Sequence, residues 1–135
     1  MTVRVVRLGT PRAADKGLRI GTVRRPPRGV PKAEFSSGNW YDVWFPTLAP
    51  SDDTFKLGRA AADDPADQAA WSRFSRAYKA EMKQAPAQHA LDLLAALSHS
   101  SALSVGCYCA DESHCHRSIL RTLLRERGAS LADSA

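Results

Sequence analysis

The 135-residue chain is 44% hydrophobic and 24% charged, an ordinary composition for one globular domain with its own core. It has no apolar run of 18 residues, which excludes a transmembrane helix, and Arg4 and Arg7 interrupt the apolar core that a signal peptide needs. All three cysteines lie within nine residues, whereas the disulfides of secreted domains join distant segments, so we expect a cytoplasmic protein with reduced thiols.

The net charge of +5 is concentrated at the N-terminal end of the chain. Residues 1–32 contain nine basic side chains and one acidic side chain, whereas the remaining residues contain ten bases and thirteen acids. A basic segment of this kind fits binding of nucleic acid, a nucleotide or another anionic ligand, and it also fits a plain solvated face. Its densest part supplies the candidate ligand-binding residues Arg24, Arg25, Arg28 and Lys32.

The first part of the chain predicts strands. Residues 3–8 and residues 18–24 are short runs of strand-forming side chains, so each predicts a strand. Three prolines and a glycine then interrupt regular structure before residue 32. Residues 40–45 are aromatic and β-branched, which predicts a third strand or an extended segment. Residues 48–53 predict a turn in which Ser51 is a candidate N-cap.

The second part predicts helices around one buried strand. Acidic residues and a proline favour a helix start at residue 63, and an apolar stripe at helical spacing continues this helix to residue 84. Residues 87–98 predict a second helix, residues 102–108 a buried strand and residues 116–127 a last helix that Gly128 ends. The stripe of the first helix is predicted to face the core and consists of Trp71, Phe74, Tyr78 and Met82.

Strands separated by helices predict an α/β fold, in which a mostly parallel sheet is flanked by helices. We expect one small domain over residues 1–128 and a frayed tail over residues 129–135. In such sheets, ligands gather at the carboxyl ends of the strands. Arg24 and Cys107 end two of the predicted strands, so the arginine cluster and the cysteine cluster are expected to face one crevice.

Residues 104–117 hold all three cysteines and two of the four histidines, in the predicted order strand, loop, helix. The segment around Cys115 therefore falls at a helix N-terminus, where free N–H groups and the helix dipole favour anions, and favour thiolate over thiol. One interpretation is an anion or nucleotide site, in which Arg117 and Arg28 hold phosphate or carboxylate. Its candidate catalytic residues are Cys115 as nucleophile and His116 and His114 as acid or base.

Two other interpretations stay open. Cys107, Cys109 and Cys115 could form a tetrahedral zinc site with either His116 or His114, since alternation along a strand places Cys107 and Cys109 on one face. Alternatively, the cysteines are small buried hydrophobes with a structural role. Two functions therefore compete. One is an enzyme that acts on a small phosphorylated or nucleotide-like molecule, and the other is a non-catalytic module that binds a nucleotide or nucleic acid. No membrane partner is expected.

Five segments spread over most of the chain carry a family resemblance. The distinctive ones are Pro-Arg-Gly-Val at 27–30, within the run 24–32, and Cys-His-Arg at 115–117, within the run 111–117. On these motifs the chain resembles the DUF488 family, small bacterial and archaeal proteins of unassigned function. The resemblance implies a small α/β domain with a candidate site around Cys-His-Arg. The remaining resembling segments are Gly-Leu-Arg-Ile at 17–20, Leu-Ala-Pro-Ser at 48–51 and the helical run at 71–81.

Overall fold

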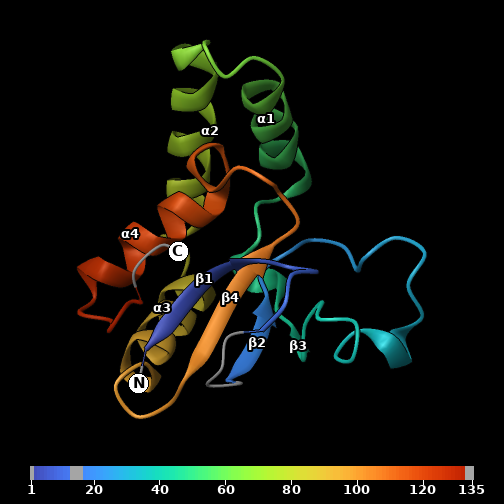
Figure 1. Cartoon of the computed structure of the whole chain (residues 1–135). Coiled ribbons are helices and arrows are strands. Elements are labelled where there is room, and N and C mark those ends of the chain that lie inside the picture. Colours follow the sequence, from blue (N-terminus) through green and yellow to red (C-terminus); the bar gives the residue numbers. More distant parts are fainter. Residues whose placement is uncertain (1, 13–16, 133–135) are drawn as a thin grey trace.

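In the computed structural model, which describes residues 2–12 and 17–132, four strands form one parallel sheet (Figure 1). The order across the sheet is β1, β4, β2, β3, so the last strand of the sequence lies between the first two. The predicted α/β fold, with a parallel sheet and flanking helices, is confirmed. The strands are β1 (Val3–Arg7), β2 (Leu18–Gly21), β3 (Val43–Trp44) and β4 (Leu103–Cys107).

Within the described residues the sheet is accompanied by four α-helices, none of which is long and apolar enough to cross a membrane. The three predicted helices are found as α2, α3 and α4. The helices are α1 (Asp52–Asp63), α2 (Gln68–Glu81), α3 (Ala85–Leu97) and α4 (His116–Glu126). Three single turns of 3-10 helix lie between them, at η1 (Lys32–Glu34), η2 (Pro46–Leu48) and η3 (Glu112–His114).

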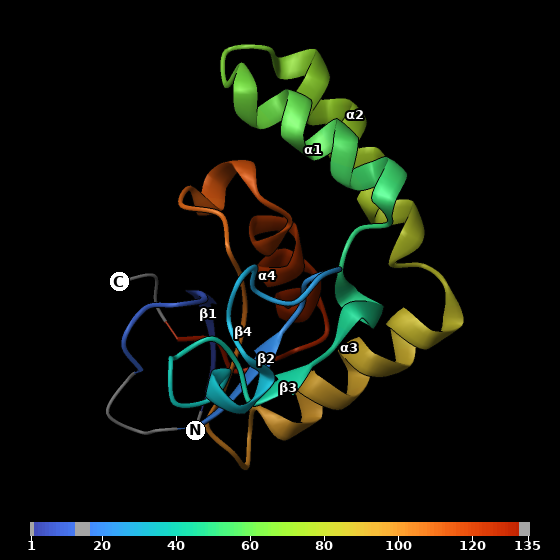
Figure 2. The same cartoon turned by 90° about the vertical axis from the view of Figure 1, so that its right-hand side faces the viewer.

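Helix α1 is the element that the sequence analysis does not predict. Ser51 does cap a helix, because its side chain accepts a hydrogen bond from the Thr54 N–H group. The helix predicted from residue 63 begins later, after Asp67, whose carboxylate accepts from the Ala70 N–H group. Helices α1 and α2 thus form a hairpin, which stands beyond the carboxyl ends of the strands (Figures 1 and 2).

Helices α3 and α4 pack on one face of the sheet and form the main core with it. Alternate strand residues such as Val3 and Val105 are fully buried there against Leu91 of α3 and Leu120 of α4. The predicted stripe of α2 reaches the same core, since Phe74, Tyr78 and Met82 are buried in it and Trp71 packs against it. Helix α2 is therefore anchored in the core by its apolar side chains. Its hairpin partner α1 lies above the ends of the strands (Figure 1).

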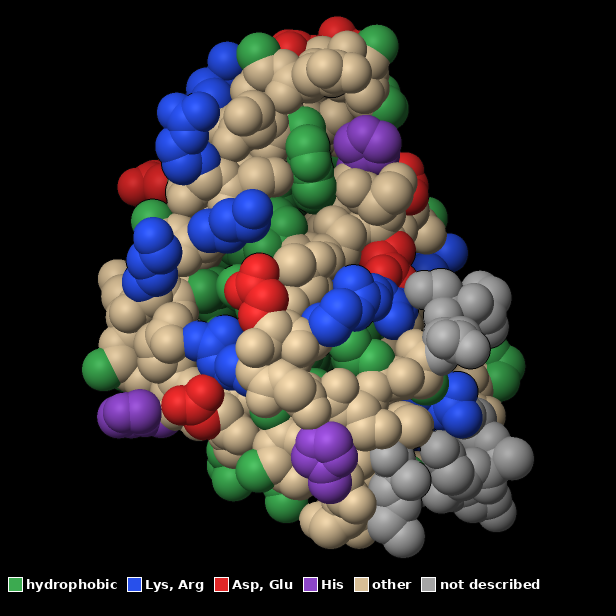
Figure 3. All heavy atoms as spheres, turned by 90° about the vertical axis from the view of Figure 1, so that its left-hand side faces the viewer, with side chains coloured by type: hydrophobic (Ala, Val, Ile, Leu, Met, Phe, Trp, Pro, Cys, Tyr) green, Lys and Arg blue, Asp and Glu red, His purple; other side chains and the backbone are tan. Residues whose placement is uncertain are grey.

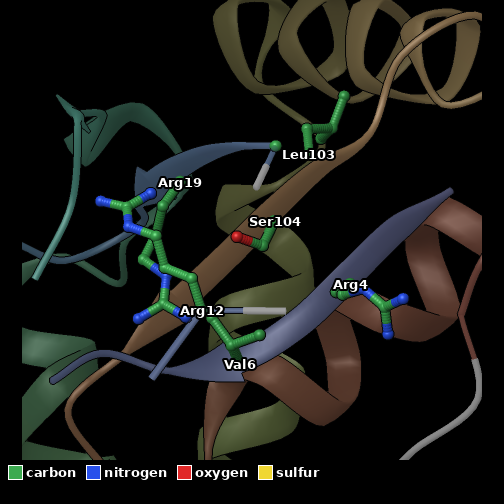
Figure 4. Close-up of a pocket in the computed structure, with 7 residues that line it drawn as sticks. Arg4, Val6, Arg12, Arg19, Leu103 and Ser104 are labelled. Atoms are coloured by element: carbon green, nitrogen blue, oxygen red, sulfur yellow. The ribbon is translucent and has the colours of Figure 1, made fainter. Parts of the chain in front are cut away.

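Loops cover the opposite face of the sheet, where Arg4, Ser104 and Arg19 are neighbours in register across three strands. Arg19 is buried, and its guanidinium donates hydrogen bonds to the carbonyl oxygens of Thr10 and Asn39, which ties two loops to the sheet. Figure 4 shows the small cavity beside it, with Arg4 at one end. Its volume of about 20 Å³ has room for a water molecule but for no organic ligand.

Residues 130–132 bond to β1; the predicted frayed tail spans residues 129–135, of which 133–135 lie outside the described residues, so the fraying stays a prediction. The Val3 N–H group donates to the carbonyl oxygen of Ser130 (2.8 Å), and the Ala132 N–H group donates to the carbonyl oxygen of Val3 (3.0 Å). Gly128 adopts a φ of 78°, which turns the chain after α4 and directs it back toward β1. These bonds extend the edge of the sheet beside β1.

Replacement of Ser51 by alanine is expected to lower the free energy of unfolding by about 1 kcal/mol, the usual cost of losing an N-cap. Besides capping α1, Ser51 donates a hydrogen bond to Glu81, whose carboxylate also accepts from the Thr54 hydroxyl group (2.7 Å). Urea unfolding followed by circular dichroism measures the change. Ser72→Ala, at an exposed position of α2, is the control. An equal loss in both variants would show that the cap contributes nothing.

Candidate functional site

A pocket of about 1110 Å³ opens at the carboxyl ends of the strands, below α1. Most of its lining comes from four parts of the chain, namely residues 7–10 at the end of β1, the loop at 23–28, helix α1 and the segment 107–116, and Trp40, Pro50 and Phe74 complete it. Parallel α/β sheets commonly bind ligands at this edge, because all the strands deliver their following loops to it. The position is the one that the sequence analysis expects.

The arginine cluster and the cysteine cluster share this pocket. Arg24, Arg25 and Arg28 line it together with the predicted site residues of segment 107–116. Lys32 lies apart in η1, where it is exposed. Arg7 and Arg59 also line the pocket, and the sequence analysis misses both. The lining residues of segment 107–116 are Cys107, Tyr108, Cys109, His114, Cys115 and His116.

The three predicted arginines differ in how firmly they are held. Arg24 donates to the carbonyl oxygens of Ala49 and Pro50, and Arg25 forms an exposed ion pair with Asp52 (3.1 Å). Arg28 is exposed and has no hydrogen bond or ion pair with any residue that the structure describes. Its charge is therefore the one in this cluster that is best able to meet a ligand.

On the face shown in Figure 3, basic and acidic side chains alternate over the surface and form no continuous basic patch. The arginines of the pocket, in contrast, are grouped around one hollow, and Asp52 is its one acidic lining residue among those described. Five arginines and one aspartate thus give the lining of this pocket an excess of positive charge.

The three cysteine sulfur atoms lie within 4.8 Å of one another, and those of Cys107 and Cys115 are 2.8 Å apart. Cys107 ends the buried strand β4, and Cys115 is the N-cap residue of α4. The loop between them is folded back by Asp111, whose carboxylate accepts hydrogen bonds from the N–H and hydroxyl groups of Ser113. Strand end and helix start are thereby brought together, with Cys109 as the exposed member of the group.

The surroundings of Cys115 favour its thiolate form. Hydrogen bonds from the thiols of Cys107 and Cys109, together with the Arg117 backbone N–H group and the Arg117 charge, lower the pKa of Cys115 to about 3 despite its burial. The Cys107 thiol is the donor toward Cys109 and Cys115, which raises the pKa of Cys107, and burial adds to this effect. One negative charge is thus shared among three sulfur atoms and centred on Cys115.

Arg117 lies beneath the sulfur atoms and does not line the pocket. It is 3% exposed, and its guanidinium donates to the carbonyl oxygen of Cys109 (2.6 Å), while its Nε atom has no partner among the described residues. The sequence analysis assigns Arg117 to the ligand itself. In the structure its charge acts on the sulfur atoms of Cys107 and Cys115 and lowers the pKa of Cys115, so it favours negative charge on the sulfur cluster.

His116 faces the cluster in one fixed orientation. Its Nε2 atom lies 2.8 Å from the carbonyl oxygen of Thr22, so Nε2 carries the proton and donates it. The unprotonated Nδ1 atom then lies 3.7 Å from the Cys115 sulfur. Burial lowers the pKa of His116 to about 4, so the ring is neutral at pH 7. This state favours a holding role over proton transfer near neutral pH.

Replacement of His116 by glutamine is expected to reduce the loss of stability in acid. In the unfolded chain this histidine binds a proton once the pH falls below the ordinary histidine pKa of about 6.5. In the folded chain it stays neutral down to about pH 4, so the folded state loses stability as the pH falls between these two values. From pH 7 to pH 5 the contribution is about 2 kcal/mol. Urea unfolding at the two pH values measures it, with the exposed His89→Gln as control. An unchanged difference in His116→Gln would contradict the buried neutral ring.

His114 is the more accessible of the two histidines. Its Nδ1 atom lies 3.0 Å from the Asp111 carboxylate, and its ring meets the edge of Trp71 with the centroids 5.5 Å apart. These contacts leave Nε2 as the free ring nitrogen beside the pocket. Of the two predicted acid–base residues, His114 is therefore better placed to exchange a proton with a bound molecule.

A parallel α/β sheet with three adjoining cysteines, a buried arginine and further arginines at its strand ends defines a small α/β protein with a cysteine-centred site. The chain belongs to the DUF488 family: the family model DUF488-N3a, described as "Active DUF488-N3 subclade", matches residues 3–128. The resemblance noted in the sequence is thus confirmed over nearly the whole chain. Neither the curated proteins nor the solved structures contain a match to it.

Proposed function

We propose that this chain is a thiol-dependent enzyme that acts on a small phosphorylated or nucleotide-like molecule. Cys115 is its nucleophile, and the arginine-lined pocket binds the anionic substrate. The position of Cys115 carries the proposal, because this residue lines the pocket at the N-terminal end of α4, where the Arg117 N–H group donates to its sulfur and the helix dipole favours negative charge. The chemistry needs reduced thiols, so we place the protein in the cytoplasm.

Substrate binding follows from what surrounds Cys115. Arg28 has its charge free for a phosphate group, and Arg7 and Arg59 add positive charge from two other walls of the pocket. The rings of Trp40 and Tyr108 also line the pocket, with their centroids 6.0 Å apart. Arginine with aromatic rings is a combination that holds the phosphate and the base of a nucleotide, which supports a nucleotide-like substrate.

The proposed reaction is a displacement at phosphorus. The Cys115 sulfur forms a bond to phosphorus while the bond to the departing oxygen breaks, and His114 gives that oxygen a proton. Water then attacks phosphorus and returns a proton to His114, and the sulfur–phosphorus bond breaks, which releases phosphate and restores the thiolate. Arg117 stabilises the thiolate before attack, and His116 keeps the sulfur in place through its bond to Thr22.

Inorganic phosphate is expected to protect Cys115 from alkylation by iodoacetamide, because both reach the sulfur through the same pocket. Replacement of Arg28 by alanine should raise the phosphate concentration needed for half protection roughly tenfold, the loss of one charge-assisted hydrogen bond. Peptide mass spectrometry after alkylation gives the rate at Cys115 alone. Arg73→Ala, which removes an exposed arginine outside the pocket, is the matched control. Equal rates with and without phosphate would contradict anion binding beside the thiolate.

A non-catalytic module that binds a nucleotide or nucleic acid is the alternative with the same pocket. Such a module would bind an oligonucleotide with an affinity that falls steeply with salt, and its cysteines would react as ordinary thiols. Protection by phosphate together with ordinary thiol reactivity at Cys115 would favour this function over the enzyme.

A zinc site is a second candidate, favoured by the three sulfur atoms within 4.8 Å and by His116. The Nε2 atom of His116 donates to a backbone carbonyl and Nδ1 faces Cys115, an arrangement typical of metal-binding histidines. The residues present therefore fit zinc as a Cys₃His set. Elemental analysis of the purified protein tests this candidate: one zinc per chain, with thiols that react only after chelation, would favour it over the nucleophile.

A further inference from the structure

Cys107 and Cys115 lie close enough to form a covalent bond with little movement. Their sulfur atoms are 2.8 Å apart, closer than unbonded sulfur atoms normally lie, both side chains are buried, and neither is in a disulfide. The backbone is held at both residues, because the Cys107 carbonyl oxygen accepts from the Leu8 N–H group (2.8 Å) and that of Cys115 accepts from the Ser118 N–H group (3.1 Å). The close approach is thus fixed by β4 and α4.

The two sulfur atoms have different surroundings. Cys115 begins α4 and lies beside Arg117, a buried cation whose Nε–H group has no partner in the described part of the chain. Cys107 ends a buried strand and packs in a cluster with Leu8, Val23 and Tyr41; the Arg117 charge reaches its sulfur too, but the hydrogen bonds from Arg117 go to Cys115. A thiolate beside a free cationic N–H donor suits attack on an oxygen–oxygen bond, because the donor stabilises the negative oxygen that departs.

We propose that Cys115 and Cys107 together reduce hydroperoxides, with Cys115 as the attacking sulfur and Cys107 as the thiol that completes the reaction. The peroxide reaction rests on the proposed function in one respect: both take Cys115 as the reactive sulfur of the pocket. It adds a second class of substrate, and it implies that oxidation removes the nucleophile from the first reaction until the disulfide is reduced.

Atoms and electrons balance in two steps. The Cys115 sulfur takes the outer oxygen of the hydroperoxide, the oxygen–oxygen bond breaks, and the departing oxygen takes a proton from water, which leaves Cys115 as a sulfenic acid and an alcohol as product. The Cys107 sulfur then bonds to the Cys115 sulfur, the sulfur–oxygen bond breaks, and the oxygen leaves as water with the Cys107 proton. The two sulfur atoms supply both electrons.

Cys109 is the third sulfur of the group and serves as the internal comparison. It is exposed, and its carbonyl oxygen is bound by Arg117, so its side chain extends from a loop rather than from the end of a strand. The 2.8 Å approach belongs to Cys107, so the disulfide is expected between Cys107 and Cys115 and not with Cys109.

The test treats the purified, reduced full chain with one equivalent of hydrogen peroxide and maps the products by peptide mass spectrometry. One disulfide per chain between Cys107 and Cys115 is expected, in the wild type and in Cys109→Ser alike. In Cys107→Ser no thiol at position 107 can react with the sulfenic acid of Cys115. The sulfenic acid should therefore persist, and dimedone should label Cys115. Circular dichroism confirms that each variant is folded.

Reduced Cys115 after this treatment would overturn the proposal, and so would a wild-type disulfide that uses Cys109. The wild-type map alone decides this, whether or not a variant folds. The proposed function is judged separately, by protection of Cys115 with inorganic phosphate. Protection without a disulfide would remove the peroxide reaction alone, and a disulfide without protection would remove the phosphoryl reaction alone.

Discussion

Replacement of Cys115 by serine is expected to abolish alkylation of the reduced protein by iodoacetamide in mild acid. The pKa of Cys115 is about 3, so this residue stays ionised at about pH 5, where ordinary thiols are almost wholly protonated. Serine keeps the hydrogen-bonding position but gives no nucleophilic anion. The observed rate should therefore fall about tenfold or more in the variant. The Cys115 thiolate is less nucleophilic than an ordinary thiolate, but it keeps its charge at this pH, whereas ordinary thiols do not.

Cys109→Ser is the matched control for this result, since it removes the exposed thiol and leaves Cys115 in place. Its rate in mild acid should stay within about twofold of the wild-type rate, because the serine hydroxyl group can donate to the Cys115 sulfur in place of the Cys109 thiol. If Cys115→Ser kept the wild-type rate and Cys109→Ser lost it, the reactive thiol would be Cys109.

Replacement of Gly106 by alanine is expected to lower the free energy of unfolding by about 3 kcal/mol. A Cβ atom at this position in β4 would lie 2.7 Å from the Val6 carbonyl oxygen and 2.9 Å from a Leu8 methyl group, so β1 would have to move away. The Gly106 carbonyl oxygen also accepts from the Thr22 hydroxyl group (3.0 Å), and the next residue is Cys107. The change should therefore disturb both the sheet and the sulfur cluster.

Gly29→Ala is the control for Gly106→Ala, because Gly29 has a φ of 76° but a Cβ atom added there would meet no described atom within 4 Å. It should cost only about 1 kcal/mol, the strain of a left-handed backbone at a residue other than glycine. Guanidinium unfolding compares the two variants. Equal losses would show that the contact between β1 and β4 at Gly106 is not tight.

The parts of the fold that were predictable are those with a strong repeating pattern. Trp71, Phe74 and Tyr78 recur at helical spacing and face the core, so α2 is evident from the sequence. Helix α1 is not, because its inward positions are filled by small residues such as Gly58 and Ala61, and Phe55 is exposed. The return of residues 130–132 to β1 depends on backbone bonds that no side-chain pattern reveals.

The site was predictable as far as the strand ends determine it. Because β2 and β4 are parallel neighbours, the segments after them meet, and Arg24 and Cys107 line one pocket. The same argument applied to the end of β1 would have found Arg7. Arg59 required knowledge of α1, and the bond from His116 to Thr22 required the position of the ring.

The rate at which iodoacetamide alkylates Cys115, measured as a function of pH, tests the central claim most directly. Peptide mass spectrometry resolves Cys115 from the other two thiols. Because the pKa of Cys115 lies at about 3, its rate is predicted to be constant from about pH 5 to about pH 8. A rate that rises roughly tenfold per pH unit over this range, with a midpoint near the ordinary thiol pKa of about 8.5, would contradict the thiolate and with it the nucleophile.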